Sequence, residues 1–325
     1  MSIAHAPLGL LTDVFPNIKL MKKINTSILF GIFIVSLVFS VDAQRKRPPA
    51  KPKPKPIIFA VLNDGQTLEP IAAIDKGKLV ALVGGDGEPK PLKSFVNTYY
   101  KPQTTYNLIF GGVMNGKVTI KSSSPDSDCG KNLATVTTQS AKAKLKGMVM
   151  GLATNETTLK SAEGLRRLPT AAERREIESL VRAEFAKQNV SANAVKKLQY
   201  YNLTALDVND DNEAEMVGSF WVESSIKERN LLFFIADKDS GGKYKFGFSE
   251  YKKVTPEEVM SGDLKDLDTG IGSELLLDAL EYNSDTTAEV FTINKAFEGN
   301  NFHVYSRQDG KWTRVFEGYN YHCAY

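Results

Sequence analysis

One stretch of the chain concentrates oxygen-bearing side chains at the spacing of an ion-binding loop. Asp207, Asn209, Asp211 and Glu215 occupy positions 1, 3, 5 and 9 of a short segment between two apolar runs. Ca²⁺ is a hard cation that takes about six to eight oxygen ligands, and odd-numbered side chains converge when such a loop curls. Asn212 stands where these loops usually place glycine, and Asn tolerates the left-handed conformation. The segment predicts a Ca²⁺ site.

A second segment repeats this pattern at a constant offset of 74 residues. Glu281, Asn283, Asp285 and Glu289 carry side-chain oxygens at the same four positions, but Thr286 stands at the glycine position. The second loop is therefore the weaker candidate. For both loops the alternative is a hairpin turn that is stabilised by local side-chain hydrogen bonds and holds no ion.

The two acidic segments lie inside two sets of four period-two apolar runs, which indicate consecutive β-strands. Their repetition predicts stacked β modules, and two modules cannot close a propeller alone. The N-terminal half is therefore expected to complete the fold or to form a separate lobe. The expected strands of the modules are 200–207, 214–222, 230–237, 244–251, 275–281, 288–293, 302–306 and 312–316.

The first acidic loop resembles the DxDxDGxxD/E loop of FG-GAP and VCBS repeats, the integrin-like propeller repeats that are common in exported bacterial proteins. The resemblance rests on Asp207-x-Asn209-x-Asp211-Asn212-x-x-Glu215 and covers about 155–320. It implies that these aspartate, asparagine and glutamate side chains are Ca²⁺ ligands.

The remaining elements complete an α+β fold that is mainly antiparallel β. Residues 57–155 predict a small β lobe, with strands over 57–62, 68–74, 78–83, 106–110, 117–121 and 141–153. Hairpin turns are expected at Asp64-Gly65 and at Asn115-Gly116, and Gly84–Gly87 before two prolines is interpreted as a turn. Residues 156–325 predict the repeat domain, with a helix near 171–188 behind the capping box Thr170–Glu173 and a short helix from Thr255.

The N-terminus has the layout of an export signal. Met21, Lys22 and Lys23 precede the apolar run 28–41, and Val41-Asp42-Ala43 offers a cleavage site. Residues 21–43 are therefore predicted to be a signal peptide, and 1–20 an upstream-start extension. The alternative is an uncleaved anchor, although the run is short for a bilayer core. Basic residues directly after the run argue against export.

Residues 44–56 read QRKRPPAKPKPKP and predict a semi-rigid basic linker. It is either a tether to an anionic surface or a solvated spacer without a partner. The whole chain has a formal charge of +3. The body, residues 57–325, holds 32 Lys and Arg against 36 Asp and Glu, a charge of −4. The net positive charge of the whole chain therefore comes from the leader and the linker. The sequence predicts no nucleic-acid partner.

Cysteine and histidine usage restricts the chemistry. Cys129 and Cys323 are the only cysteines, and an exported protein would bond them, the alternative being two free thiols. His303 and His322 are the only histidines after the leader, and the metalloprotease, serine hydrolase and phosphate-loop motifs are missing. The sequence leaves open catalysis by a pair of carboxylates on the β scaffold, one acting as general acid and the other as general base.

Together these patterns predict an exported protein, periplasmic or extracellular, without a transmembrane span after signal cleavage. The favoured function is a non-enzymatic binding or structural β-repeat protein that is stabilised by Ca²⁺ and contacts an envelope polymer or protein. The alternative is a carboxylate-based hydrolase of an envelope polysaccharide or peptide.

Overall fold

A computed structural model of the chain describes residues 53–84, 87–157 and 166–323, all within one compact unit, Pro52–Tyr325. The predicted extension 1–20, the signal peptide 21–43 and the linker up to residue 52 lie outside the described residues. No helix among the described residues is long and apolar enough to cross a membrane.

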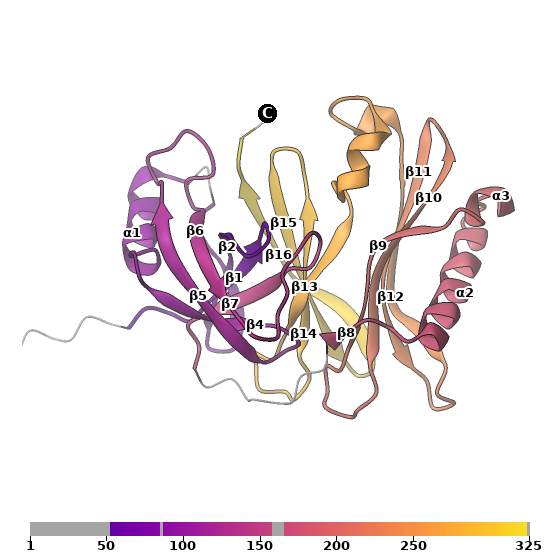
Figure 1. The fold of residues 1–325 in the computed structure, drawn as a ribbon, viewed down its shortest axis with the longest axis horizontal. Coiled ribbons are helices and arrows are strands. Elements are labelled where there is room, and N and C mark those ends of the chain that lie inside the picture. The colour runs from indigo at the N-terminus through magenta and orange to yellow at the C-terminus, as the bar shows by residue number, and fades with distance from the viewer. Residues whose placement is uncertain (1–52, 85–86, 158–165, 324–325) are drawn as a thin grey trace, which may run out of the picture. The chain divides into compact units, whose positions relative to one another are not determined.

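The N-terminal half forms a barrel of antiparallel strands (Figure 1). Its strands follow the order β1-β7-β4-β5-β6-β2, and β2 pairs back with β1 to close the ring, while β3 extends from β2. Phe59, Leu108 and Val118 fill its interior, and Phe95 of helix α1 joins this core. The bounds are β1 Ile57–Leu62, β2 Thr67–Asp75, β3 Lys78–Ala81, α1 Pro89–Tyr99, β4 Thr105–Ile109, β5 Met114–Ser123, β6 Ala134–Gln139 and β7 Gly151–Thr154.

In this half one helix was not expected, and two local expectations are wrong. A helix, α1, begins at Pro89, directly after the segment interpreted as a turn, because proline fits the first turn of a helix. The β4–β5 hairpin turns at Gly111 and Gly112, which both have positive φ, and not at Asn115-Gly116. Only the end of the expected strand 141–153 is extended, as β7. The hairpin at Asp64-Gly65 is confirmed, with Leu62 opposite Thr67.

The C-terminal half contains two antiparallel four-stranded meanders, as the sequence predicts. The first is β9–β12, to which the short β8 adds a fifth strand, and the second is β13–β16. The bounds are β8 Arg166–Arg167, β9 Gln199–Leu206, β10 Glu215–Ser225, β11 Glu228–Lys238, β12 Tyr244–Val254, β13 Glu274–Leu280, β14 Glu289–Lys295, β15 Gly299–Gln308 and β16 Lys311–Tyr321.

Helices accompany the first meander. The predicted helix is α2, Ala171–Lys187, with the expected capping box at Thr170 and Glu173. Ile177, Val181 and Phe185 pack its apolar stripe on the sheet β8–β12. The helices that complete the half are α3 Ala192–Val195, η1 Pro256–Glu258 and η2 Leu264–Thr269.

The sheet β13–β16 is a central layer (Figure 1). One of its faces, with Leu275 and Phe302, packs on the barrel. The other, with Leu276 and Tyr305, packs on the sheet β9–β12. Since both faces are covered, every residue of β13 is buried, including Asp278. The acidic loops connect β9 to β10 and β13 to β14. The packing of these two sheets on each other therefore determines the positions of the two loops.

Candidate functional site

The two acidic loops have the same backbone framework. Leu206 pairs with Glu215 in the first meander and Leu280 with Glu289 in the second, so each glutamate begins the strand after its loop. We call residues 207–215 loop 1 and residues 281–289 loop 2. The left-handed conformation recurs at equivalent positions, Asp210 and Asn212 in loop 1 and Ser284 and Thr286 in loop 2. The repeated spacing thus produces a repeated fold of the backbone.

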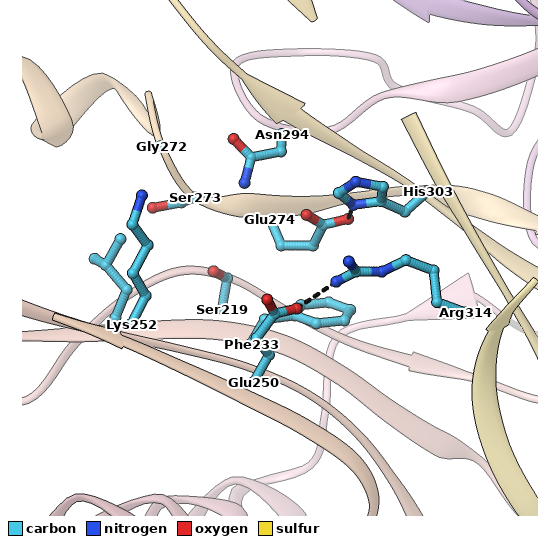
Figure 2. Close-up of a pocket in the computed structure, with 11 residues that line it drawn as sticks. Ser219, Phe233, Glu250, Lys252, Gly272, Ser273, Glu274, Asn294, His303 and Arg314 are labelled. Atoms are coloured by element: carbon cyan, nitrogen blue, oxygen red, sulfur yellow. Dashed lines mark hydrogen bonds and ion pairs between the residues drawn. The ribbon is translucent and has the colours of Figure 1, made fainter. Parts of the chain in front are cut away.

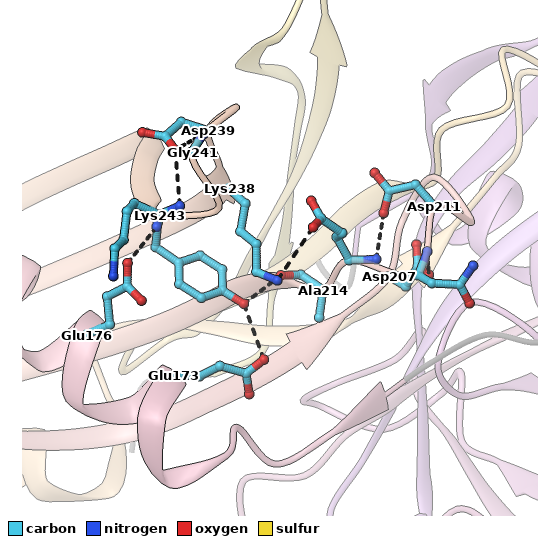
Figure 3. Close-up of polar contacts among 12 residues, drawn as sticks. Glu173, Glu176, Asp207, Asp211, Ala214, Lys238, Asp239, Gly241 and Lys243 are labelled. Atoms are coloured by element: carbon cyan, nitrogen blue, oxygen red, sulfur yellow. Dashed lines mark hydrogen bonds and ion pairs between the residues drawn. The ribbon is translucent and has the colours of Figure 1, made fainter.

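Loop 1 uses four of the six carboxylate oxygens of Asp207, Asp211 and Glu215 on amides of its own backbone (Figure 3). The two oxygens of Asp207 accept from the amides of Asp210 and Asn212, at 2.8 and 2.9 Å. Glu215 accepts from the Val208 amide at 3.2 Å. Asn209 Nδ2 donates to Asp211 at 2.9 Å, and Asn209 Oδ1 is buried without a hydrogen-bond partner. Loop 1 is therefore close to the alternative of a self-satisfied turn.

The side chains of loop 2 contact one another, but more of its buried oxygens lack a hydrogen-bond partner than in loop 1. Asn283 Nδ2 donates to both Asp285 and Glu289, at 3.0 and 2.6 Å. One oxygen of Glu281 accepts backbone amides, whereas the other, Oε2, is buried without a partner. Glu289 is 0% exposed, and its Oε2 also lacks a partner. Two buried carboxylate oxygens of loop 2 thus lack a hydrogen-bond donor or cation, which buried oxygens normally have.

Burial makes the glutamate at the end of each loop costly to ionise. It raises the pKa of Glu215 to about 7, and the charges of Asp237 and Asp211 raise it further. It likewise raises the pKa of Glu289 to about 8, with added repulsion from Asp285 and Glu281. A bound cation would remove this repulsion and the cost of burial together.

The loops contact each other and are supported differently. The Ala288 amide of loop 2 donates to the Val208 carbonyl of loop 1 at 2.7 Å. Beside loop 1, the Tyr244 hydroxyl donates to the Ala214 carbonyl at 3.0 Å and lies 3.4 Å from Glu173 of α2 (Figure 3). Loop 1 is thereby fastened to α2, and loop 2 to loop 1.

No group of three or more His, Cys, Asp or Glu in the described ranges is arranged as a metal site. An amide oxygen belongs to each predicted set, at Asn209 and Asn283, so neither loop offers only acidic ligands. Loop 2, expected to be the weaker candidate, has two buried carboxylate oxygens without a hydrogen-bond partner, whereas the one such buried oxygen of loop 1 belongs to an amide.

The predicted bond between Cys129 and Cys323 is present, with an S–S distance of 2.02 Å and 5.3 Å between the Cα atoms. It joins the loop between β5 and β6 to the segment after β16, across 194 residues of sequence. The bond therefore ties the barrel to the end of the central sheet.

A small cavity of about 80 Å³ lies between the two C-terminal sheets (Figure 2). Glu274 accepts from Thr292 and lies 2.8 Å from His303 Nδ1, and Glu250 pairs with Arg314. Small-molecule sites usually measure about 300–1,000 Å³. With both carboxylates engaged and little volume, this cavity offers the hydrolase hypothesis no pair of free carboxylates.

Two buried acids have roles that the sequence analysis missed. Asp278 pairs with Arg166 at 2.5 Å and accepts the Gly111 and Gly112 amides at 3.0 Å, linking β13 to the barrel. Glu69, only 1% exposed, lies 2.9 Å from His322 Nε2. Each is an acid inside an apolar strand, a pattern that could have indicated a buried ion pair but could not identify its distant partner.

Comparison of the chain with protein-family models, with curated proteins and with solved structures finds no match.

Proposed function

We propose that the protein is an exported, non-enzymatic β protein that binds Ca²⁺ at its two acidic loops and uses this stabilised scaffold for binding or structure at the cell envelope or outside the cell. The partner is an envelope polymer or another envelope protein. The basic linker 44–56 assists by contacting an anionic surface.

Calcium binding is supported above all by Glu289. A fully buried carboxylate with one unpaired oxygen is costly, and here the unpaired Oε2 of Glu281 belongs to the same loop. Both groups are hard oxygen donors, which suit Ca²⁺. Asn283 contacts Asp285 and Glu289, so the four predicted ligands of loop 2 belong to one connected cluster.

Export is supported by two independent features. The segment 21–43 has the layout of a signal peptide. The disulfide between Cys129 and Cys323 is a bond that persists in oxidising compartments and is rare in the cytosol. The resemblance of loop 1 to FG-GAP and VCBS repeats agrees with the same location.

The test is calcium titration of the purified chain by isothermal calorimetry after removal of divalent ions with chelator, with thermal unfolding measured in parallel. Saturable Ca²⁺ binding and a rise in Tm with added Ca²⁺ are expected, because a ligand of the folded state stabilises it. The double variant Glu215→Gln and Glu289→Gln should lose both effects. Asp309→Asn, in an exposed turn outside the loops, is the matched control.

Identical melting of the wild type in Ca²⁺ and in chelator, with no heat of binding, would contradict the calcium proposal. Export is tested separately by fractionating cells that express the full chain or a chain lacking residues 21–43. Recovery of both chains in the cytosol would contradict it.

A further inference from the structure

A second cavity, distinct from the acidic loops, opens where β14 and β15 meet. It has a volume of about 350 Å³, within the range of about 300–1,000 Å³ that is typical of small-molecule sites. Apolar side chains on one part of its wall are Met260, Ile271 and Phe297. Its polar groups are Lys295, Asn300 and His322. A mostly apolar wall with a few polar groups is the usual composition of a ligand site.

A buried carboxylate fixes two of these polar groups. Glu69 of the barrel accepts from Asn300 Nδ2 at 2.7 Å through one oxygen, and its other oxygen lies 2.9 Å from His322 Nε2. The His322 amide also donates to the Glu298 carbonyl at 2.7 Å. The imidazole and the amide side chain are therefore held in place before any ligand arrives, which reduces the entropy lost on binding.

Lys295 adds a second basic group to the wall of the cavity. It lies directly opposite Asn300 in the β14–β15 register, so both side chains belong to the same face of the sheet. The ammonium of Lys295, which is half-buried, has no hydrogen bond or ion pair with another described residue. Glu69 is already hydrogen-bonded to Asn300 and to His322, so the Lys295 ammonium is the basic group of the cavity that is open to an anionic ligand.

The surroundings of the two basic groups shift their pKa values in opposite directions. The hydrogen bond with Glu69 raises the pKa of His322 and favours its protonated form. Burial lowers the pKa of Lys295 because it desolvates the ammonium, and the nearby charge of Glu69 offsets only part of this cost. An anionic ligand would recover this cost.

We propose that this cavity binds a small monocarboxylic acid that carries an apolar group. The carboxylate contacts Lys295 and His322, and the apolar group lies against Met260, Ile271 and Phe297. The cavity shares no residue with the acidic loops, so the inference stands apart from calcium binding.

The experiment measures phenylacetate binding to the full chain by isothermal calorimetry, both in Ca²⁺ and in chelator. Phenylacetamide, which is uncharged, and acetate, which lacks the ring, are the comparison probes. Phenylacetate is expected to bind at least about tenfold more tightly than either probe, because each lacks one of the two interactions. Lys295→Met should weaken phenylacetate binding by at least about tenfold, whereas Lys295→Arg should retain most of it.

Lys265→Met is the matched control, because Lys265 is exposed on η2 and does not line the cavity. Circular dichroism and Tm establish that each variant is folded. The proposal is overturned if wild-type protein shows no saturable phenylacetate binding up to about 20 mM, well above the millimolar affinity expected for so small a ligand. Equal affinity for acetate, or unchanged affinity in Lys295→Met, overturns it as well. The wild-type comparison of the three probes needs no variant.

Discussion

The two acidic loops share a backbone but differ in how completely their oxygens are paired. In loop 1 both oxygens of Asp207 accept backbone amides. In loop 2 Glu281 stands at that position, and one of its oxygens is unpaired. Glu281 accepts the Asn283 and Ser284 amides through one oxygen only, whereas Asp207 accepts one amide with each of its two oxygens. The two loops therefore differ in which buried side-chain oxygens the backbone satisfies.

The loops also differ in their attachment. Loop 1 is fastened to α2 through Tyr244, near the surface of the first meander. Loop 2 follows β13, which is buried between two layers and tied to the barrel through Asp278. Loop 1 is thus attached to an outer part of the fold, whereas loop 2, with similar ligand spacing, is attached to the central sheet.

The largest expected effect tests this difference in attachment. Asp278→Asn removes the partner of Arg166, whose side chain is only 7% exposed, and should lower the free energy of unfolding by about 3–5 kcal/mol. Thr204 occupies the equivalent position in the strand before loop 1, and Thr204→Val should change stability by less than about 1 kcal/mol. Urea unfolding measures both. Similar losses would show that the two supports are equivalent.

A second prediction separates the ion affinities of the loops. A loop whose Kd is about one hundredth of the free Ca²⁺ concentration contributes about 2.7 kcal/mol to the free energy of unfolding, and a loop with a weaker Kd contributes less. Glu289→Gln should abolish the contribution of loop 2 and Glu215→Gln that of loop 1. We expect the loss to be larger for Glu289, since its unpaired oxygen gains a partner only from the ion. A larger loss for Glu215→Gln in calcium-dependent unfolding would reverse the ranking.

A third prediction concerns the attachment of loop 1 and its pH dependence. Hydrogen bonds from Arg167 lower the pKa of Glu173 from 4.5 to about 2. Because the folded-state pKa is the lower one, this stabilisation is complete above about pH 4.5 and is lost as the pH falls toward 2. Glu173→Gln should cost about 1 kcal/mol at pH 7 and nothing near pH 2. Unfolding curves at several pH values measure this, and a pH-independent cost would argue against the pair.

The smallest effect tests the backbone of the turns. Thr286 has φ 77°, a conformation that is strained for a β-branched residue, whereas Asn212 at φ 65° tolerates it. Thr286→Gly should raise the free energy of unfolding by about 1 kcal/mol, and Asn212→Gly should change it by less than about 0.5 kcal/mol. Thermal unfolding in chelator separates these effects from ion binding. Equal changes in the free energy of unfolding for Thr286→Gly and Asn212→Gly would show that the two positions are equally strained.

Much of the fold follows from local signals in the sequence. The eight strands of the meanders and the capped helix α2 were predicted because period-two alternation and a capping box act over a few residues. Helix α1 was missed because Pro89 and Pro91 were interpreted as evidence against a helix after the turn Gly84–Gly87, although proline is accepted in a first helical turn. Closure of the barrel was missed because β7 pairs with β1 across about a hundred residues.

The candidate sites divide in the same way. The loop ligands could be found because they are close in sequence, but the ranking of the loops depends on which oxygens the folded backbone satisfies. The cavity at Lys295 could not be found, since Glu69 and His322 are 253 residues apart and meet only after the central sheet has packed on the barrel. The arrangement of Lys295, Glu69 and His322 exists only in the folded chain.

The central position of the sheet β13–β16 has a consequence for how the protein opens. Because its two faces supply core residues to both neighbouring layers, neither layer can detach without exposing apolar surface on the shared sheet. Amide protons of β13 and β14 should therefore exchange with solvent only through global unfolding, while those of the edge strand β12 exchange through local fluctuations. We therefore expect the three described layers to unfold together, with the middle layer opening last.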